Sequence, residues 1–235
     1  MPSSLSSEAG VTPSQSWLLM HAVIFDLDGV LIDSEALQYE AYSQVLARFD
    51  ARVTRDEYAE HWIAAGRGPE YAVRKFGLPI AAEELRALKH PVYHRLLEQQ
   101  ITLMPGAAAA LARLQPHFAL AVATNSNRAD VGFVLDHLDL RRYFAAVVVR
   151  DDYTRTKPDP DAFLTAAARL GVAAAACLVV EDSYRGIVAA QRAGAACVAV
   201  PNAFTRDSDF SLAAAVLQSL DELSVALVER LVARH

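Results

Sequence analysis

Short, continuous apolar runs alternate with helix-like stretches in the part of the chain that follows residue 105. This alternation predicts βαβ units and a parallel sheet, because a strand that is buried on both faces carries uninterrupted apolar side chains. The predicted strands are Ala119–Thr124, Ala145–Val149, Cys177–Glu181 and Cys197–Pro201. The predicted helices are Ala107–Leu114, Ala129–Leu138, Asp161–Leu170 and Tyr184–Ala193. The pattern therefore indicates an α/β fold.

A further apolar run begins at Ala22 and ends abruptly in two carboxylates, Asp26 and Asp28, with Gly29 directly after them. In open α/β sheets, ligands bind just beyond the carboxyl ends of the strands, where a nucleophile and a proton donor are useful. An ordinary strand that ends in an Asp-Gly turn has the same local pattern. The rest of the chain has to decide between these two interpretations.

Residues 35–103 show apolar side chains at helical spacing and almost no runs of β-branched residues. Two amphipathic helices are predicted, one through residues 37–49 and one through residues 85–97. We therefore expect an all-helical insert that leaves the sheet after the first strand and returns at Met104. Its two connections then lie beside the paired aspartates, which is how a lid is attached.

The chain divides on this basis into three parts. A tail at residues 1–19 precedes a core formed by residues 20–34 and 104–235, and the helical cap occupies residues 35–103. The tail has no periodic apolar pattern to bury, which predicts a loosely held segment. Met20, just before the first predicted strand, is a candidate for the true start of the protein.

The chain has 235 residues and a formal net charge of −6. This balance gives no footprint for nucleic acid or an anionic membrane surface, so we expect neither as a partner. No apolar stretch reaches the length of a membrane span, and the N-terminus lacks the features of a secretory signal. Two cysteines, Cys177 and Cys197, lie in apolar runs, which favours buried thiols in a reducing compartment. We expect a cytoplasmic protein and, as the simpler state for a core with its own lid, a monomer.

Three more polar segments follow other predicted strands. They are Thr124-Asn125-Ser126, the loop with Lys157-Pro158, and Glu181-Asp182-Ser183. Because the carboxyl ends of parallel strands meet at one edge of a sheet, we expect these segments to converge with Asp26 and Asp28.

The chemistry that fits this set is phosphoryl transfer. A carboxylate such as Asp26 can attack phosphorus and form an aspartyl phosphate, which divides one hard displacement into two easier ones. A second carboxylate, Asp28, can protonate the leaving oxygen and then deprotonate the attacking water. The phosphoryl group needs Mg²⁺ and fixed donors, and Mg²⁺ prefers carboxylates, carbonyls and water. Thr124 can serve as a phosphate donor, Lys157 as the fixed cation and Asp182 as a further metal carboxylate.

The segments 26–35, 124–126, 157–158 and 181–187 resemble the four successive motifs of the haloacid dehalogenase superfamily in residue type, order and spacing. The resemblance extends from Met20 to about Leu223, and it is closest to the group with β-phosphoglucomutase and small sugar-phosphate phosphatases. It implies a Rossmann-like parallel-sheet core under a movable helical cap, dependence on Mg²⁺, and an aspartyl-phosphate intermediate at Asp26.

The resemblance also implies roles for individual residues. It implies that Asp26 is the nucleophile and Asp28 the general acid/base. The implied metal residues are Asp26, Asp28, Asp182 and Glu181. Asp28 would bind the metal through its backbone carbonyl, and Glu181 would bind it directly or through water. The implied phosphate-binding residues are Thr124, Asn125 and Lys157. Family members that cleave carbon-halogen or carbon-phosphorus bonds lack an aspartate at the position of Asp28, so its presence favours phosphate esters.

Two cations in the predicted cap are candidates for substrate specificity. Arg67 lies where related caps carry a loop that reaches into the site, and the alternative is a solvated loop cation. Lys89 lies near the place where a mutase-like cap holds the distal phosphate, but its neighbours do not reproduce the mutase pattern. A solvated helix face is the favoured interpretation of Lys89.

Several other polar residues have mainly structural interpretations. His90 and His94 are interpreted as surface or cap-core histidines, because no third metal-ligand pattern accompanies them. Ser34 and Glu35 are expected to cap or open the first helix of the insert. For Arg185, an exposed position or a salt bridge to Glu35 or Asp33 competes with a substrate role. The segment 202–209 is expected to close the far edge of the core.

These observations predict a Mg²⁺-dependent phosphatase for a small phosphorylated metabolite, with sugar phosphates as the leading class. One alternative is a sugar-phosphate mutase similar to β-phosphoglucomutase, which uses the same core and differs in how the cap holds the sugar. A second alternative is a non-catalytic protein that binds a phosphometabolite. The presence of both a candidate nucleophile and a candidate acid/base argues against it, because binding alone needs neither.

Overall fold

The computed structural model describes residues 21–235, and its core is a six-stranded parallel sheet with the strand order β3-β2-β1-β4-β5-β6. The strands are β1 (Ala22–Phe25), β2 (Ala119–Ala123), β3 (Ala146–Val148), β4 (Cys177–Glu181), β5 (Ala196–Ala199) and β6 (Ala215–Val216). The expected α/β, Rossmann-like parallel sheet is confirmed, and the short edge strand β6 is an addition to it. The predictions for the tail at 1–19 and for Met20 lie outside the described residues.

The first strand occupies the centre of the sheet. All four residues of β1 are fully buried, and they pair in parallel with β2 on one side and β4 on the other. The ladder continues one step past the strand, since the Asp26 N–H donates to the Val180 carbonyl over 2.9 Å. Asp26 is thereby held at the carboxyl edge of the sheet by the strand pairing itself.

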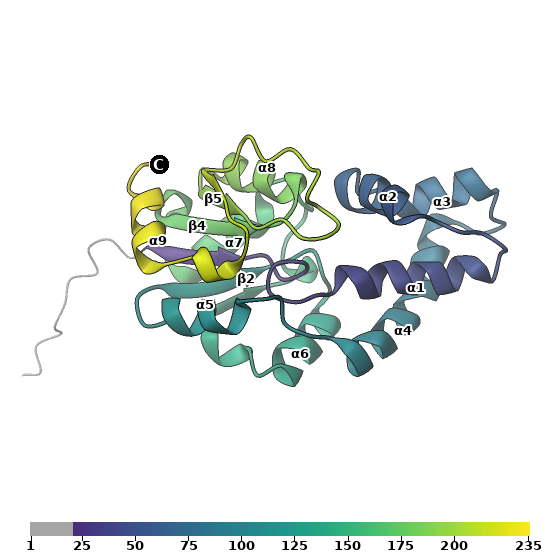
Figure 1. Cartoon of the computed structure of the whole chain (residues 1–235), viewed down its shortest axis with the longest axis horizontal. Helices are drawn as coiled ribbons and strands as arrows, with labels where there is room; N and C mark the ends of the chain where they lie inside the picture. Colours follow the sequence, from purple (N-terminus) through teal and green to yellow (C-terminus); the bar gives the residue numbers. More distant parts are fainter. Residues whose placement is uncertain (1–20) are drawn as a thin grey trace, which may run out of the picture.

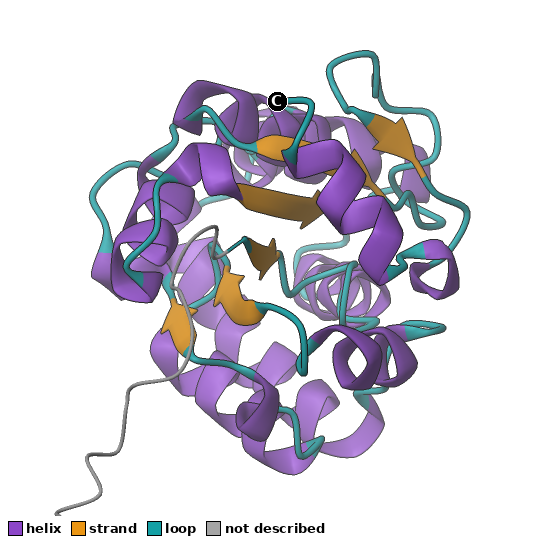
Figure 2. Ribbon diagram, turned by 90° about the vertical axis from the view of Figure 1, so that its left-hand side faces the viewer, coloured by secondary structure: helices purple, strands orange, loops and turns teal. Residues whose placement is uncertain are grey.

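Helices cover both faces of the sheet (Figure 2). The covering helices are α5 (Ala107–Leu114), α6 (Arg128–His137), α7 (Asp161–Leu170), α8 (Tyr184–Ala193) and α9 (Val225–Val232). Helices α5, α6 and α9 pack on the face that carries Val23 and Phe25, whereas α7 and α8 pack on the face that carries Ala22 and Ile24. Short 3-10 turns lie at Arg141–Tyr143, Arg150–Asp152, Ala174–Ala176 and Leu220–Glu222.

Four further helices stand together at one end of the molecule, beyond the carboxyl edge of the sheet (Figure 1). They are α1 (Glu35–Ala47), α2 (Arg55–Tyr58), α3 (Gly68–Phe76) and α4 (Ala82–Gln100), with a π-helical turn at Ala59–Ala64 between α2 and α3. The two chain segments that join them to the sheet lie side by side. The Asp33 N–H donates to the Thr102 carbonyl over 3.0 Å, and the Met104 N–H donates to the Leu31 carbonyl over 2.9 Å.

Two other sequence-based expectations concern the whole molecule. Cys177 and Cys197 are both buried free thiols. Across residues 21–235, no helix combines the length and the apolar character that crossing a bilayer requires.

Candidate active site

The loops at the carboxyl edge of the sheet surround a pocket of about 320 Å³. Its wall includes Asp26, Asp28, Thr124, Asn125, Lys157, Glu181 and Asp182. These residues come from four separate parts of the sequence. The polar segments therefore converge at one edge of the sheet, as the sequence predicts.

An ammonium between two carboxylates forms the floor of the pocket. Lys157 Nζ donates to Asp26 Oδ1 over 2.5 Å, to Glu181 Oε1 over 2.7 Å and to the Ala123 carbonyl over 2.9 Å. Only 4% of the Lys157 side chain is exposed. Burial alone lowers the pKa of Lys157, but attraction by Asp26 and Glu181 outweighs it and raises the pKa above its ordinary value. Lys157 is therefore a fixed cation.

Three buried carboxylates meet closely enough to share a cation. One oxygen each of Asp26, Glu181 and Asp182 lies within 4.8 Å of the others. Burial, joined by repulsion from Glu181, raises the pKa of both Asp26 and Asp182 well above the ordinary range, although Lys157 lowers it. Carboxylate oxygens are the ligands that Mg²⁺ prefers, and a dication offsets this repulsion. The donor set fits Mg²⁺.

Glu181 differs from its two neighbours because protein donors occupy both of its oxygens. Oε1 accepts from Lys157, whereas Oε2 accepts the Asp182 N–H, the Ser183 N–H and the Ser183 hydroxyl. Gly186 makes room for this carboxylate, since a Cβ there would overlap the Glu181 side chain. The arrangement favours an indirect contribution of Glu181 to a metal, with Asp26 and Asp182 as the more available ligands.

Asp28 lies in a ring of hydroxyl groups. Ser34 Oγ donates to Oδ1 over 2.7 Å, while Thr124 Oγ1 and Ser126 Oγ donate to Oδ2 over 2.9 Å and 2.7 Å. The Ser126 N–H also donates to Thr124 Oγ1. In this arrangement the Thr124 hydroxyl orients Asp28, in addition to the expected role on phosphate. The sequence reasoning missed Ser126, although it follows Thr124 in the same motif.

The comparison with known families decides what kind of protein carries this site. The family described as haloacid dehalogenase-like hydrolase matches residues 23–200. This chain belongs to that family. In this hydrolase the match extends from β1 through β5, so it includes every pocket residue of the sheet edge.

Similar proteins place the hydrolase among phosphatases. It is 32% identical to a phosphoglycolate phosphatase of Escherichia coli O157:H7, covering 88% of this chain and 92% of that protein. It is also 32% identical to a phosphorylated carbohydrates phosphatase of Thermotoga maritima, covering 74% and 82%. The crystal structure of CbbY from Rhodobacter sphaeroides with phosphate superposes with a TM-score of 0.78 at 27% identity, over 89% of this chain and 99% of that one. The chain is thus a phosphatase-type enzyme that acts on a phosphorylated substrate.

Helices α1, α2 and α4, with the π-helical turn after α2, contribute a second wall to the pocket of this hydrolase. Glu35, Gln38 and Lys89 line it together with the aromatic residues Tyr42, Tyr58 and Trp62. The Tyr58 hydroxyl donates to Glu35 Oε2 over 3.0 Å. Burial, with repulsion from Asp28, raises the pKa of Glu35 from 4.5 to about 7. A carboxyl group that titrates near neutrality therefore faces the pocket.

Lys89 is in the pocket wall, so its interpretation as part of a solvated helix face is wrong. Its ammonium donates to Gln38 Oε1 and lies 4.2 Å from the centroid of the Tyr93 ring. Burial lowers the pKa of Lys89 to about 8. Arg67, by contrast, is exposed at the start of α3 and is not among the lining residues of the described pocket. Lys89 faces the pocket from α4, whereas Arg67 lies at the N-cap of α3, outside the pocket.

Ser34 and Arg185 also differ from their expected structural roles. Ser34 occupies the N-cap position of α1, but its hydroxyl makes no cap hydrogen bond because it donates to Asp28 instead. Glu35 does open α1. Arg185 lines the pocket and donates to the Lys157 carbonyl rather than to Glu35 or Asp33. A Cβ on Gly66 would overlap the Arg185 guanidinium, so the loop between the π-helical turn and α3 packs directly against this arginine.

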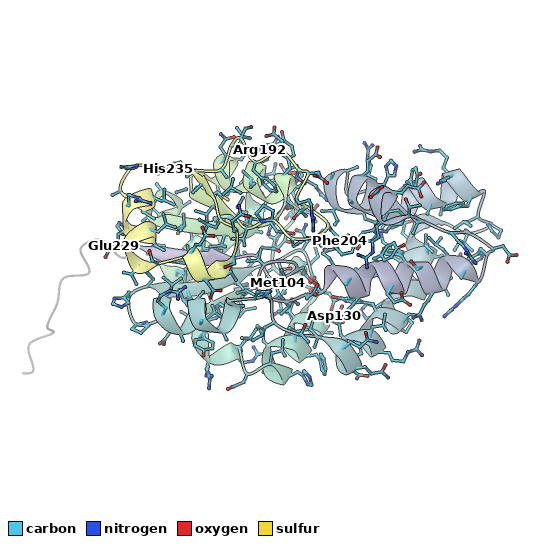
Figure 3. All side chains as sticks on the ribbon, in the orientation of Figure 1. Met104, Asp130, Arg192, Phe204, Glu229 and His235 are labelled. Atoms are coloured by element: carbon cyan, nitrogen blue, oxygen red, sulfur yellow. The ribbon has the colours of Figure 1, made fainter. Side chains whose placement is uncertain are left out.

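Two histidines of α4 contact Asp130 of α6, which Figure 3 labels where the helices α1–α4 meet the rest of the chain. His94 Nδ1 lies 3.1 Å from Asp130 Oδ1, and His90 Nε2 lies 3.4 Å from Asp130 Oδ2. The two histidines thus meet a carboxylate of α6.

The expectation that residues 202–209 close the far edge of the core is wrong for Asn202, which donates to Asp182 at the pocket.

Proposed function

We propose that this enzyme is a Mg²⁺-dependent phosphatase that hydrolyses a small sugar phosphate through an aspartyl phosphate at Asp26. The observation that carries the proposal is the convergence of Asp26, Asp28, Lys157 and Asp182 in one pocket. A protein that only binds a phosphate group needs cations and donors, but it needs neither a carboxylate nucleophile nor a second carboxylate for proton transfer.

In the first step, an Asp26 oxygen forms a bond to phosphorus while the bond from phosphorus to the sugar oxygen breaks. Asp28 gives a proton to that leaving oxygen, so the sugar departs as an alcohol. Lys157, 2.5 Å from Asp26, stabilises the carboxylate before attack and the phosphoryl oxygens afterwards. Thr124 and Asn125 are the proposed donors to the phosphoryl group. Mg²⁺, when held by Asp26, Asp182 and the Asp28 carbonyl, offsets the negative charge of the carboxylates and of the phosphoryl group.

In the second step, Asp28 takes a proton from water as the water oxygen attacks phosphorus. The bond between phosphorus and Asp26 breaks, which releases inorganic phosphate, regenerates the Asp26 carboxylate and leaves Asp28 protonated for the next turnover. The three hydroxyls of Ser34, Thr124 and Ser126 hold Asp28 in one orientation for both proton transfers. Orientation matters because misplacement of a catalytic group by about 1 Å costs on the order of a hundredfold in rate.

Residues 35–103 are the proposed cap, and residues 20–34 with 104–235 the proposed core. The cap wall presents a carboxyl group, an amide, an ammonium and a phenol from Glu35, Gln38, Lys89 and Tyr58. Such mixed donors and acceptors suit the hydroxyl groups of a sugar better than they suit an apolar leaving group. The similarity to a phosphatase named for phosphorylated carbohydrates supports the same substrate class. Both walls come from one chain, which supports a monomeric enzyme.

The test is an incubation of the enzyme and Mg²⁺ with sugar phosphates, phosphoglycolate and nucleotides, in which free phosphate and sugar-phosphate isomers are both measured. We expect free phosphate from a few sugar phosphates, and no phosphate release after chelation of Mg²⁺ or from Asp26→Asn. Isomers without free phosphate would show a mutase. Intact mass after acid quench is expected to show one added phosphoryl group on the wild type and none on Asp26→Asn, whose circular dichroism should match the wild type.

A further inference from the structure

Asn202 contacts one carboxylate of the candidate metal site, Asp182, and the turn after Asp28, without lining the pocket. Its Nδ2 donates to Asp182 Oδ2 over 2.7 Å and to the Gly29 carbonyl over 3.2 Å. Within residues 21–235, no donor bonds the other oxygen of Asp182, Oδ1. One oxygen of Asp182 is therefore held by the amide, and the other is left for a cation.

The packing around this amide leaves the Asp182 carboxylate little room to turn. Gly29 has a φ of +75°, and a Cβ on it would lie 2.6 Å from both Asn202 Nδ2 and Asp182 Oδ2. Glycine is needed there for the left-handed backbone and for the close approach. The amide and the carboxylate are thus clamped against the turn that follows Asp28.

The turn that carries Asn202 fixes which way its amide points. Asn202 Oδ1 accepts the Phe204 N–H over 2.8 Å, so Nδ2 must face Asp182. The Asn202 N–H donates to the hydroxyl of Thr205 over 3.0 Å, and Thr205 is fully buried. The side chain is therefore oriented by its own turn before any ligand arrives.

The same turn contacts the proposed cap. The Phe204 ring packs against Tyr58 and Tyr39, with ring centroids 5.8 Å and 6.2 Å apart, and the Arg55 guanidinium carbon lies 5.4 Å from the Phe204 centroid. Figure 3 labels Phe204 where the yellow-green loop meets the helices α1–α4 at the right of the view. Asn202 and Phe204 together connect the cap aromatics to Asp182.

We propose that Asn202 is a positioning residue that holds Asp182 in its metal-binding orientation, and that Phe204 anchors this turn to the cap. The inference rests on the proposed Mg²⁺ site. Groups that orient metal ligands by hydrogen bonds typically change metal affinity or activity by about 10–100-fold when they are removed. Because Phe204 acts through the turn of Asn202, the position of the cap and the orientation of Asp182 are coupled.

The test measures Mg²⁺ affinity by isothermal titration calorimetry in the absence of substrate. Asn202→Ser keeps a hydroxyl that can accept the Phe204 N–H and so preserves the turn, but it is too short to reach Asp182. We expect its Mg²⁺ affinity to fall about 10–100-fold, and its kcat to recover at saturating Mg²⁺. Ala203→Ser, at the exposed neighbouring position, is the control and should bind Mg²⁺ as the wild type does.

Phe204→Ala tests the coupling. We expect a smaller loss of Mg²⁺ affinity than in Asn202→Ser, and no further loss when both changes are combined, because the two residues act in series. Additive losses, or a wild-type affinity in Phe204→Ala, would overturn the coupling. A wild-type affinity in Asn202→Ser, or a loss of kcat that saturating Mg²⁺ does not restore, would overturn the positioning role alone. A wild-type enzyme that takes up no Mg²⁺ would overturn the metal site and this inference with it.

Discussion

Ser34 Oγ donates to Asp28 Oδ1 over 2.7 Å. Ser34 stands directly before α1, the first helix above the sheet, and Asp28 follows β1. The other oxygen of Asp28 is bound by hydroxyls from the segment after β2. The candidate acid/base is therefore held jointly by the sheet edge and by the start of the upper helices.

Asp28→Asn should lower the rates of both phosphoenzyme formation and phosphoenzyme hydrolysis by at least about a hundredfold, because general acid/base catalysis supplies about 10²–10⁴ in rate. Ser34→Ala should have a much smaller effect, since two hydroxyls still hold Asp28. Single-turnover measurements of both steps check this. Unchanged rates in Asp28→Asn would remove this residue from proton transfer.

Lys157→Met should destabilise the fold by about 3–5 kcal/mol, because it leaves the buried carboxylates of Asp26 and Glu181 without their cation. Lys75→Met is the matched control. Lys75 also pairs with a glutamate, Glu57, but at the surface, where solvent screens the pair. Urea denaturation should show a much smaller loss for Lys75→Met. Equal losses would mean that the buried ammonium is not what stabilises the floor of the pocket.

Glu35→Gln should change how stability depends on pH. The pKa of Glu35 is about 7 in the folded enzyme and 4.5 ordinarily, so the folded state keeps the proton longer than the unfolded state. Wild-type stability therefore falls as the pH rises from about 4.5 to about 7. Glutamine does not titrate, so Glu35→Gln should gain stability relative to the wild type between pH 5 and pH 8.

The control for this measurement is Glu40→Gln, which changes an exposed glutamate on the same helix. Urea unfolding at pH 5 and at pH 8 should show that Glu40→Gln gains no stability relative to the wild type between these two pH values. If the two variants behave alike, the titration of Glu35 is not coupled to folding.

Lys89→Met should change the ranking of substrates, because Lys89 lies in the pocket wall above the proposed site of the sugar. We expect kcat/KM for the preferred sugar phosphate to fall more than kcat/KM for an aryl phosphate that makes no such contact. Arg67→Ala tests the other predicted specificity residue. Its exposed position predicts an unchanged ranking. A changed ranking in Arg67→Ala would mean that its loop closes on the substrate.

The sequence predicted the first five strands and four of the five core helices to within a few residues, because their apolar periodicity is local, whereas β6 and α9 were not predicted. The predicted helix at Ala129–Leu138, for example, is observed at Arg128–His137. Predictions of polar side-chain contacts were less successful. Ser34 was expected to cap a helix, but its hydroxyl bonds Asp28, since a nearby carboxylate competes for the same donor.

The sequence by itself determined which chemistry meets at the sheet edge. Parallel strands end at the same edge, so the order of the strands along the chain was enough to bring Asp26, Asp28, Lys157 and Asp182 into one site. The tertiary structure alone decided the contacts between distant segments, such as Asn202 with Asp182 and Lys89 with Gln38. Those contacts depend on how loops and helices pack across the pocket, and no local spacing in the sequence records that packing.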